Sequence, residues 1–122
     1  MGSQAYDLSV GERLRRGIAY KVEGQYEAAK QELLAALEAD PDNAVAHREI
    51  GLVYCFTGLF EESIQELRKA VELDPTDLES RNHLALIYSM VGMYEEARAG
   101  FEVVLEMDPT NAVAQRNIVY FR

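Results

Sequence analysis

The sequence has little of what anchors or cross-links many other proteins. A single cysteine, Cys55, stands among its 122 residues, so no disulfide can form within the chain, which fits a reducing compartment. No run of about 18 apolar residues occurs, so we expect no membrane-spanning helix. The N-terminal segment MGSQAYDLSV lacks the apolar stretch of an export signal. Together these absences predict a cytoplasmic protein.

Basic residues are also scarce. The chain has 12 Lys and Arg against 21 Asp and Glu, which gives a formal net charge of −9. Proteins that bind nucleic-acid backbones or anionic membranes present a basic face, so we expect neither a nucleic acid nor a membrane as partner. Hydrophobic residues make up 48% of the chain, which is enough to build a core and excludes a disordered acidic tail.

Proline is limited to three residues, and these are evenly spaced. Pro41, Pro75 and Pro109 lie 34 residues apart. Other residue types keep the same interval: Gly24, Gly58 and Gly92; Tyr20, Tyr54 and Tyr88; Tyr26, Phe60 and Tyr94; Ala29, Ser63 and Ala97; Leu33, Leu67 and Phe101. So many coincident positions at one period indicate a tandem repeat.

Each repeat contains two helical patterns. Apolar residues recur at three- and four-residue steps over 44–57 and again over about 59–73, with Gly58 between them as a turn residue. Asp74-Pro75 ends the second helix, because the residue before proline disfavours the helical conformation. Thr76 with Glu79, and Ser9 with Glu12, have the spacing of a capping box. No stretch alternates with period two, so we expect no sheet.

These positions resemble the tetratricopeptide repeat (TPR) family. The residues at the positions of its pattern are Arg13, Arg16, Gly17, Tyr20, Ala29, Leu33, Ala36 and Pro41 in the first unit; His47, Ile50, Gly51, Tyr54, Ser63, Leu67, Ala70 and Pro75 in the second; and Arg81, Leu84, Ala85, Tyr88, Ala97, Phe101, Val104 and Pro109 in the third. Arg16 departs from the pattern, which has leucine there. The resemblance implies an all-α fold, a right-handed α-solenoid of three helix-turn-helix repeats plus a C-terminal capping helix. We expect one domain over residues 9–122, with repeats 10–43, 44–77 and 78–111, a capping helix 112–122 and a flexible tail 1–8.

In this family the first helices of the repeats line a concave groove. The groove-lining residues that the resemblance implies are Leu14, Arg15, Ile18, Arg48, Leu52, Phe56, Asn82, His83, Leu86, Met90, Arg116, Asn117 and Tyr120, with Val22 beside them. First helices carry more basic than acidic residues although the protein is acidic, so Arg48 is expected to be an exposed groove residue. An apolar floor with arginines suits a protein or peptide partner, including one that carries acidic residues.

The expected function is non-catalytic protein binding, as an adaptor or scaffold. Some family members hold a terminal carboxylate with Lys and Asn at five positions, which here are Leu14, Ile18, Glu49, Glu79 and His83, so that clamp is not expected. An asparagine ladder is not expected either, because its position holds Arg15, Glu49, His83 and Asn117. Two alternatives stay open: a structural protein that self-assembles through the array ends, and a fragment of a larger multidomain protein or enzyme.

No residue pattern predicts catalysis. Cys55 and His47 are too far apart on one helix for a thiol–imidazole pair, and Cys55 is expected to be buried and inert. One cysteine and two separated histidines make no zinc site, and we expect no cofactor or metal. The apolar run Ile118–Phe121 covers most of a helix surface, so one neighbouring repeat cannot bury it. A homo-oligomer formed through the C-terminal helix is therefore possible.

Overall fold

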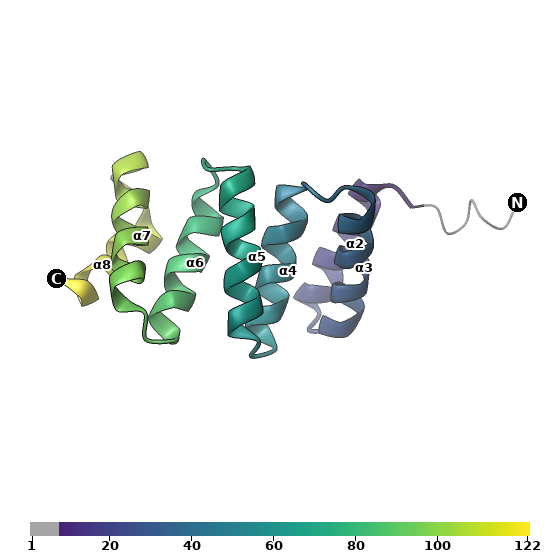
Figure 1. The fold of residues 1–122 in the computed structure, drawn as a ribbon, viewed down its shortest axis with the longest axis horizontal. Coiled ribbons are helices and arrows are strands. Elements are labelled where there is room, and N and C mark those ends of the chain that lie inside the picture. Colours follow the sequence, from purple (N-terminus) through teal and green to yellow (C-terminus); the bar gives the residue numbers. More distant parts are fainter. Residues whose placement is uncertain (1–7) are drawn as a thin grey trace, which may run out of the picture.

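The computed structural model describes residues 8–122, and most of the predicted tail lies outside them. Within these described residues, seven α-helices form three antiparallel pairs and a single last helix (Figure 1). The pairs are α2 (Val10–Val22) with α3 (Tyr26–Ala39), α4 (Ala44–Phe56) with α5 (Phe60–Leu73), and α6 (Leu78–Met90) with α7 (Tyr94–Met107). The last is α8 (Ala112–Ile118), followed by the short 3-10 helix η1 (Val119–Phe121). The described residues contain no strand, and the predicted helical-repeat fold is confirmed.

The C-terminal segment differs from the prediction. The expected helix 112–122 is α-helical only to Ile118, after which Val119–Phe121 tighten into one 3-10 turn. Tightening of the last turn is common at helix ends, where the final carbonyls lack partners further along the chain. Among the described residues, no helix is both long and apolar enough to span a bilayer.

A side-chain cap begins each first helix. The residue immediately before the helix accepts a hydrogen bond from the backbone amide three residues on: Ser9, Asn43, Asp77 and Asn111. The Ser9 half of the predicted capping box forms, because the Glu12 amide donates to the Ser9 hydroxyl at 3.1 Å, whereas the Glu12 carboxylate accepts from that hydroxyl, also at 3.1 Å, in place of the Ser9 backbone amide. The capping box predicted at Thr76 is wrong. Thr76 instead donates its hydroxyl to Asp74 at 2.7 Å, and Asp77 is the cap.

Glycines with positive φ join the two helices of each pair. Gly24, Gly58 and Gly92 have φ values of 79°, 82° and 86°, a region that costs little only for glycine. The backbone amides of the residues that follow them reach back five residues, as Leu59 does to the Tyr54 carbonyl at 2.8 Å. The turn therefore closes each first helix and starts the second in the opposite direction.

Small residues lie where the two helices of a pair approach most closely. A Cβ at Gly51 would stand 2.9 Å from the Leu67 side chain, so the second pair needs glycine there. Buried Ser63 donates its hydroxyl to the Gly51 carbonyl at 2.6 Å, which satisfies a polar group in an otherwise apolar contact. In the third pair the glycine lies on the second helix: α6 carries Ala85 and α7 carries Gly100. A Cβ added at Gly100 would lie 3.0 Å from the Cβ of Ala85.

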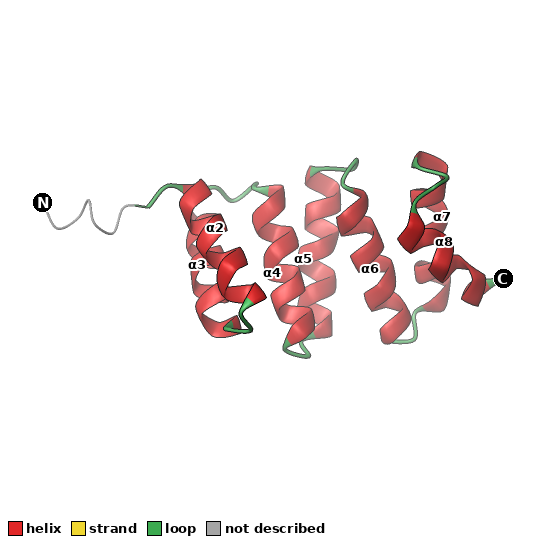
Figure 2. Ribbon diagram, turned by 180° about the vertical axis from the view of Figure 1, so that it is seen from behind, coloured by secondary structure: helices red, strands yellow, loops and turns green. Residues whose placement is uncertain are grey.

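Polar side chains on α4, α6 and α8 contact the loop that precedes each of these helices. His47, Arg81 and Gln115 occupy equivalent positions, and each contacts the proline carbonyl six residues earlier, at 2.7, 2.8 and 2.7 Å. The first helices also contact one another, α2 with α4 and α4 with α6. The first helices lie on the face turned to the viewer in Figure 2, while α3, α5 and α7 form the opposite face, turned to the viewer in Figure 1.

Candidate functional site: the first-helix groove

The residues predicted to line the groove fall into three groups by exposure. Leu52 and Asn82 are buried; Leu14, Ile18, Arg48, His83, Leu86 and Asn117 are half-buried; Arg15, Phe56, Met90, Arg116 and Tyr120 are exposed. Leu52 packs in the core between helices and is not free to contact a partner. The accessible part of the groove is therefore narrower than the sequence predicted.

Exposed apolar residues recur on the first helices, at positions predicted to line the groove. Val22, Phe56 and Met90 end α2, α4 and α6 at the same repeat position, and they are 78%, 56% and 61% exposed. The Phe56 ring leans on Tyr26 with its centroid 5.7 Å away, so it is held in place rather than free in solvent. The stripe, which we define as Val22, Phe56 and Met90, presents one large apolar side chain for each helix pair.

A network of ion pairs crosses the groove floor between helix pairs. Lys21 on α2 contacts Glu49 on α4 at 2.5 Å, and Arg48 contacts the same carboxylate at 3.1 Å. Arg48 also reaches Asp77, the cap of α6, at 3.0 Å and Glu79 at 3.9 Å. Buried Glu49 is thereby balanced by two cations. The network ties the three helix pairs together.

Arg48 was expected to be exposed, and this is wrong. Its side chain is 19% exposed because it bridges α4 to the start of α6. Asn82, at the equivalent position one repeat on, makes the same kind of contact by donating to Asn111, the cap of α8, at 3.0 Å. Sequence reasoning missed the roles of Lys21 and Asp77. The repeated 29-residue separation between this first-helix position and the next cap is the pattern that could have revealed Asp77.

Electrostatics hold two members of this region in defined charge states. Burial is the main cause that lowers the pKa of His83, and the positive charges of Lys21 and Arg48 lower it further. The carboxylates of Glu79, 3.8 Å away, and Glu49 act in the opposite direction but do not outweigh burial. Burial alone would raise the pKa of Asp77, but hydrogen bonds from Ser80 and Arg48 outweigh it and hold that pKa below its usual value. His83 is therefore neutral and Asp77 ionised near neutral pH.

The residues considered for chemistry are occupied elsewhere. His47 uses one ring nitrogen to contact Glu66 at 2.7 Å and the other to contact the Pro41 carbonyl. Cys55 was expected to be buried but is half-buried, and burial raises the pKa of its thiol, which keeps it protonated at neutral pH. No cluster of three potential metal ligands exists among residues 8–122.

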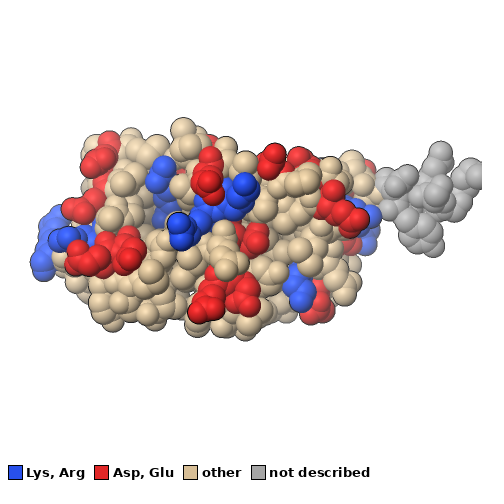
Figure 3. Space-filling view, in the orientation of Figure 1, with Lys and Arg blue, Asp and Glu red and all other residues tan. Residues whose placement is uncertain are grey.

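Charge on the outer face is mixed. Figure 3 shows lysines and arginines near the middle of the face formed by α3, α5 and α7, with acidic groups around them and along the lower edge. The first turns of the second helices are acidic, with Glu27 in α3, Glu61 and Glu62 in α5, and Glu95 and Glu96 in α7, where a negative charge interacts favourably with the helix dipole.

Comparisons with known proteins agree with this geometry. Models of the tetratricopeptide repeat match residues 14–77 and 66–99. Similar solved structures include the first TPR of Spaghetti (RPAP3) bound to the HSP90 peptide SRMEEVD, with a TM-score of 0.88, 22% identity, and coverage of 93% of this chain and 90% of that one. The second TPR domain of human RPAP3, in complex with the HSP70 peptide SGPTIEEVD, has a TM-score of 0.83, 25% identity and coverage of 89% and 91%.

A third similar structure is part of a larger protein. It is an O-GlcNAc transferase mutant from Thermobaculum terrenum, with a TM-score of 0.84, 22% identity, and coverage of 92% of this chain and 22% of that one. No curated protein sequence matches this chain. One repeat model covers more than half of the sequence, and the helix pairs, turn glycines and loop prolines keep its period. The chain belongs to the tetratricopeptide repeat family.

Proposed function

We propose that this chain is a non-catalytic protein-interaction module, an adaptor or scaffold that binds a segment of a partner protein in its first-helix groove. The observation that carries the proposal is the apolar stripe of Val22, Phe56 and Met90. Each of these side chains is more than half exposed. Large apolar side chains that stay exposed at the same position of every helix pair do not serve the core, so they support a role in contact with a partner.

The stripe also constrains the ligand. One large apolar side chain per helix pair, repeated along the array, suits a partner segment that runs across successive pairs and presents apolar side chains at intervals. Apolar burial supplies most of the affinity in such contacts, and polar neighbours supply selectivity. Phe56 is the central anchor, because it lies mid-array and is braced by Tyr26.

Acidic groups on the partner would be recognised by arginines other than Arg48. Arg48 is engaged by Glu49, Asp77 and Glu79. Arg15 and Arg116 are exposed on α2 and α8, and neither has a recorded ion pair within the described residues. They are therefore the groove cations available to a partner carboxylate.

Chaperone-tail peptides of the kind bound by the RPAP3 domains are not the ligands that this groove favours. Glu49 and Glu79 stand at two of the positions where family members hold a terminal carboxylate, and Leu14 and Ile18 are apolar. His83, at the fifth position, is neutral because burial lowers its pKa. An acidic terminus would find no lysine or arginine at these five positions and would meet the exposed carboxylate of Glu79, which disfavours binding.

The test is selection of binding peptides from a displayed random library on the wild-type chain. Selected peptides should lose affinity by about tenfold or more for Phe56→Ser and for Met90→Ser. Leu34→Ser is the matched control, since Leu34 is an exposed apolar residue on a second helix, α3. Circular dichroism should show that all three variants keep the helical content of the wild type.

Two results would count against the groove. Selected peptides that bind Phe56→Ser and Met90→Ser as tightly as wild type would move the site elsewhere. Equal loss with Leu34→Ser would show that the assay follows general hydrophobicity and not this stripe.

A further inference from the structure

A second apolar surface lies at the edge of the array, where the α4–α5 and α6–α7 turns come together. It is a depression of about 550 Å³, and we call its lining the turn notch: Gly58, Leu59, Phe60, Glu61, Glu62, Ile64, Val91 and Met93. In Figure 1 these turns lie along the lower edge of the molecule. The notch lies outside the helix-lined groove of the proposed function.

The apolar residues of the turn notch occupy positions where a turn is normally polar. Leu59, Val91 and Met93 are large, apolar and about two-fifths exposed. The first repeat has Gln25 where the later ones have Leu59 and Met93, and Glu23 where the third has Val91. The same turn geometry therefore forms with polar residues, and folding does not require the apolar ones.

The rim of the turn notch is acidic and unbalanced. Glu61 and Glu62 are exposed, and no ion pair is recorded for either within the described residues. The equivalent Glu95, by contrast, pairs with Arg98 at 2.9 Å. The notch therefore favours an occupant that combines apolar side chains with arginine or lysine.

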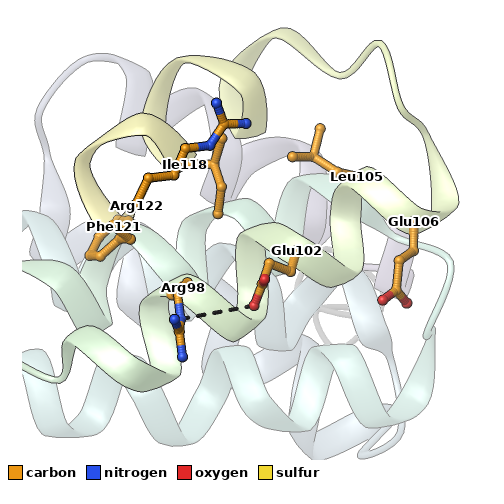
Figure 4. A pocket seen from close by; sticks show the side chains of 7 residues that line it. All are labelled: Arg98, Glu102, Leu105, Glu106, Ile118, Phe121 and Arg122. Atoms are coloured by element: carbon orange, nitrogen blue, oxygen red, sulfur yellow. Dashed lines mark ion pairs between the residues drawn. The ribbon is translucent and has the colours of Figure 1, made fainter.

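The C-terminal turn of the same chain has that composition. Val119 and Tyr120 are 52% and 80% exposed. Arg116 and Arg122 flank them, both exposed and both without a recorded ion pair within residues 8–122. Figure 4 shows Arg122 pointing away from Glu102, which pairs instead with Arg98.

We propose that the C-terminal turn of one copy, Val119 and Tyr120 with Arg116 and Arg122, docks in the turn notch of a second copy. The apolar side chains enter the notch and the arginines face Glu61 and Glu62. The contact joins two different surfaces, so it is heterologous. The net charge of −9 opposes self-association, but at about 0.15 M salt repulsion beyond a Debye length of about 8 Å is screened, and the local contact decides.

Sedimentation velocity on the 122-residue chain, from about 1 μM to about 1 mM, tests the proposal. The average mass should rise with concentration. Met93→Glu should remove the acceptor surface and Val119→Glu the donor surface, and each variant alone should associate at least about tenfold more weakly. If Met93→Glu fails to fold, Val91→Asn takes its place as the notch variant. If Val119→Glu fails to fold, Tyr120→Ser takes its place as the variant of the C-terminal turn.

Mixing the two variants is the decisive step. A Met93→Glu copy keeps its C-terminal turn and a Val119→Glu copy keeps its notch, so the mixture should form a one-to-one complex that neither variant forms alone. Charge exchange adds a second check: Glu61→Lys with Glu62→Lys should weaken association, and adding Arg116→Glu and Arg122→Glu to the same chain should restore it.

Three outcomes would overturn the proposal. A wild type that stays monomeric over the whole range has no such contact. Association that Met93→Glu leaves unchanged would place the C-terminal turn against another surface. Failure of the mixture to associate while both variants are folded would indicate contact between like surfaces. None of these results depends on a groove ligand, so the proposed function is tested separately.

Discussion

Arg48 Nη1 donates a 3.0 Å hydrogen bond to Oδ2 of Asp77, which joins the second helix pair to the residue that begins the third. Asp77 in turn accepts from the backbone amide and the hydroxyl of Ser80. One carboxylate therefore caps α6 and fixes its position against α4. The groove charge that the sequence assigned to ligand binding contributes in the folded chain to the geometry of the array.

The Asp77 contact predicts a pH-dependent contribution to stability. The pKa of Asp77 is below its usual value, so the unfolded chain binds more protons in acid and the contribution is lost as pH falls below about 4. Asp77→Asn removes the charge but keeps a side chain able to cap a helix, since asparagine is the capping residue of α4 and α8. We expect it to lower the free energy of unfolding by about 1 kcal/mol at pH 7 and by much less at pH 3. Urea unfolding at both pH values measures the difference, and an equal deficit at both would contradict the prediction.

His83 predicts a second pH effect in a different range. Burial holds its pKa below the unfolded value of about 6.5, so protonation favours the unfolded chain. The contribution of neutral His83 to the free energy of unfolding is complete above about pH 6.5, and it is lost as the pH falls through the pKa of His83 in the folded chain. His83→Gln should therefore be less sensitive than wild type to a change from pH 7 to pH 5. An NMR titration of the His83 ring with a midpoint at or above 6.5 would refute the assignment.

The turn should require glycine at position 58 because of its positive φ, and not because a side chain would clash with neighbouring atoms. The φ of Gly58 is +82°, and a Cβ there would meet no atom within 4 Å. Gly58→Ala should cost about 1–2 kcal/mol of unfolding free energy, because an L-residue with a Cβ is strained in the left-handed region. Gly58→Asn should cost less, since asparagine tolerates that region. Thermal or urea unfolding compares the two, and equal stability of Gly58→Ala and wild type would show that the turn relaxes.

Ala85 and Gly100 should be energetically coupled. A Cβ on Gly100 would lie 3.0 Å from Ala85 Cβ, which is closer than two methyl groups normally approach. The contact therefore holds one methyl group without strain, but a second one would strain it. We expect Gly100→Ala to be less favourable in the wild type than in the Ala85→Gly background, by about 0.5 kcal/mol or more. A double-mutant cycle cancels the helix propensity of alanine, which alone would favour Gly100→Ala. Strict additivity would contradict the coupling.

The sequence predicted the helical repeat well because its determinants are local. Gly58 sets a left-handed turn, Pro75 limits where a helix can continue, and the three- and four-residue steps define the buried faces. Each of these acts within a few residues, and repetition at one period made them visible. The wrong cap at Thr76 shows the limit: Thr76 and Asp77 are adjacent candidates, and only the course of the loop decides between them.

The site was predicted less well because side-chain exposure depends on contacts between helix pairs. Leu52 and Phe56 lie one turn apart on α4, yet one is buried and the other is more than half exposed. Arg48 has the sequence properties of a surface residue, and it is the distant Asp77 that draws it into an ion-pair network. The periodicity of a single helix does not reveal which of its polar residues a neighbouring helix pair will engage.

The junctions between successive helix pairs are unequal, and this gives the array a direction in which it comes apart. Lys21 with Glu49 and Arg48 with Asp77 hold the first two junctions by charge, whereas the junction to α8 has the neutral contact of Asn82 with Asn111. Hydrogen bonds between charged groups are stronger than those between neutral ones. Because each unit of a solenoid depends on its neighbours, loss of structure should begin at α8 and move inward. Amide exchange should then be fastest in α8, slower in α7 and slowest in α4.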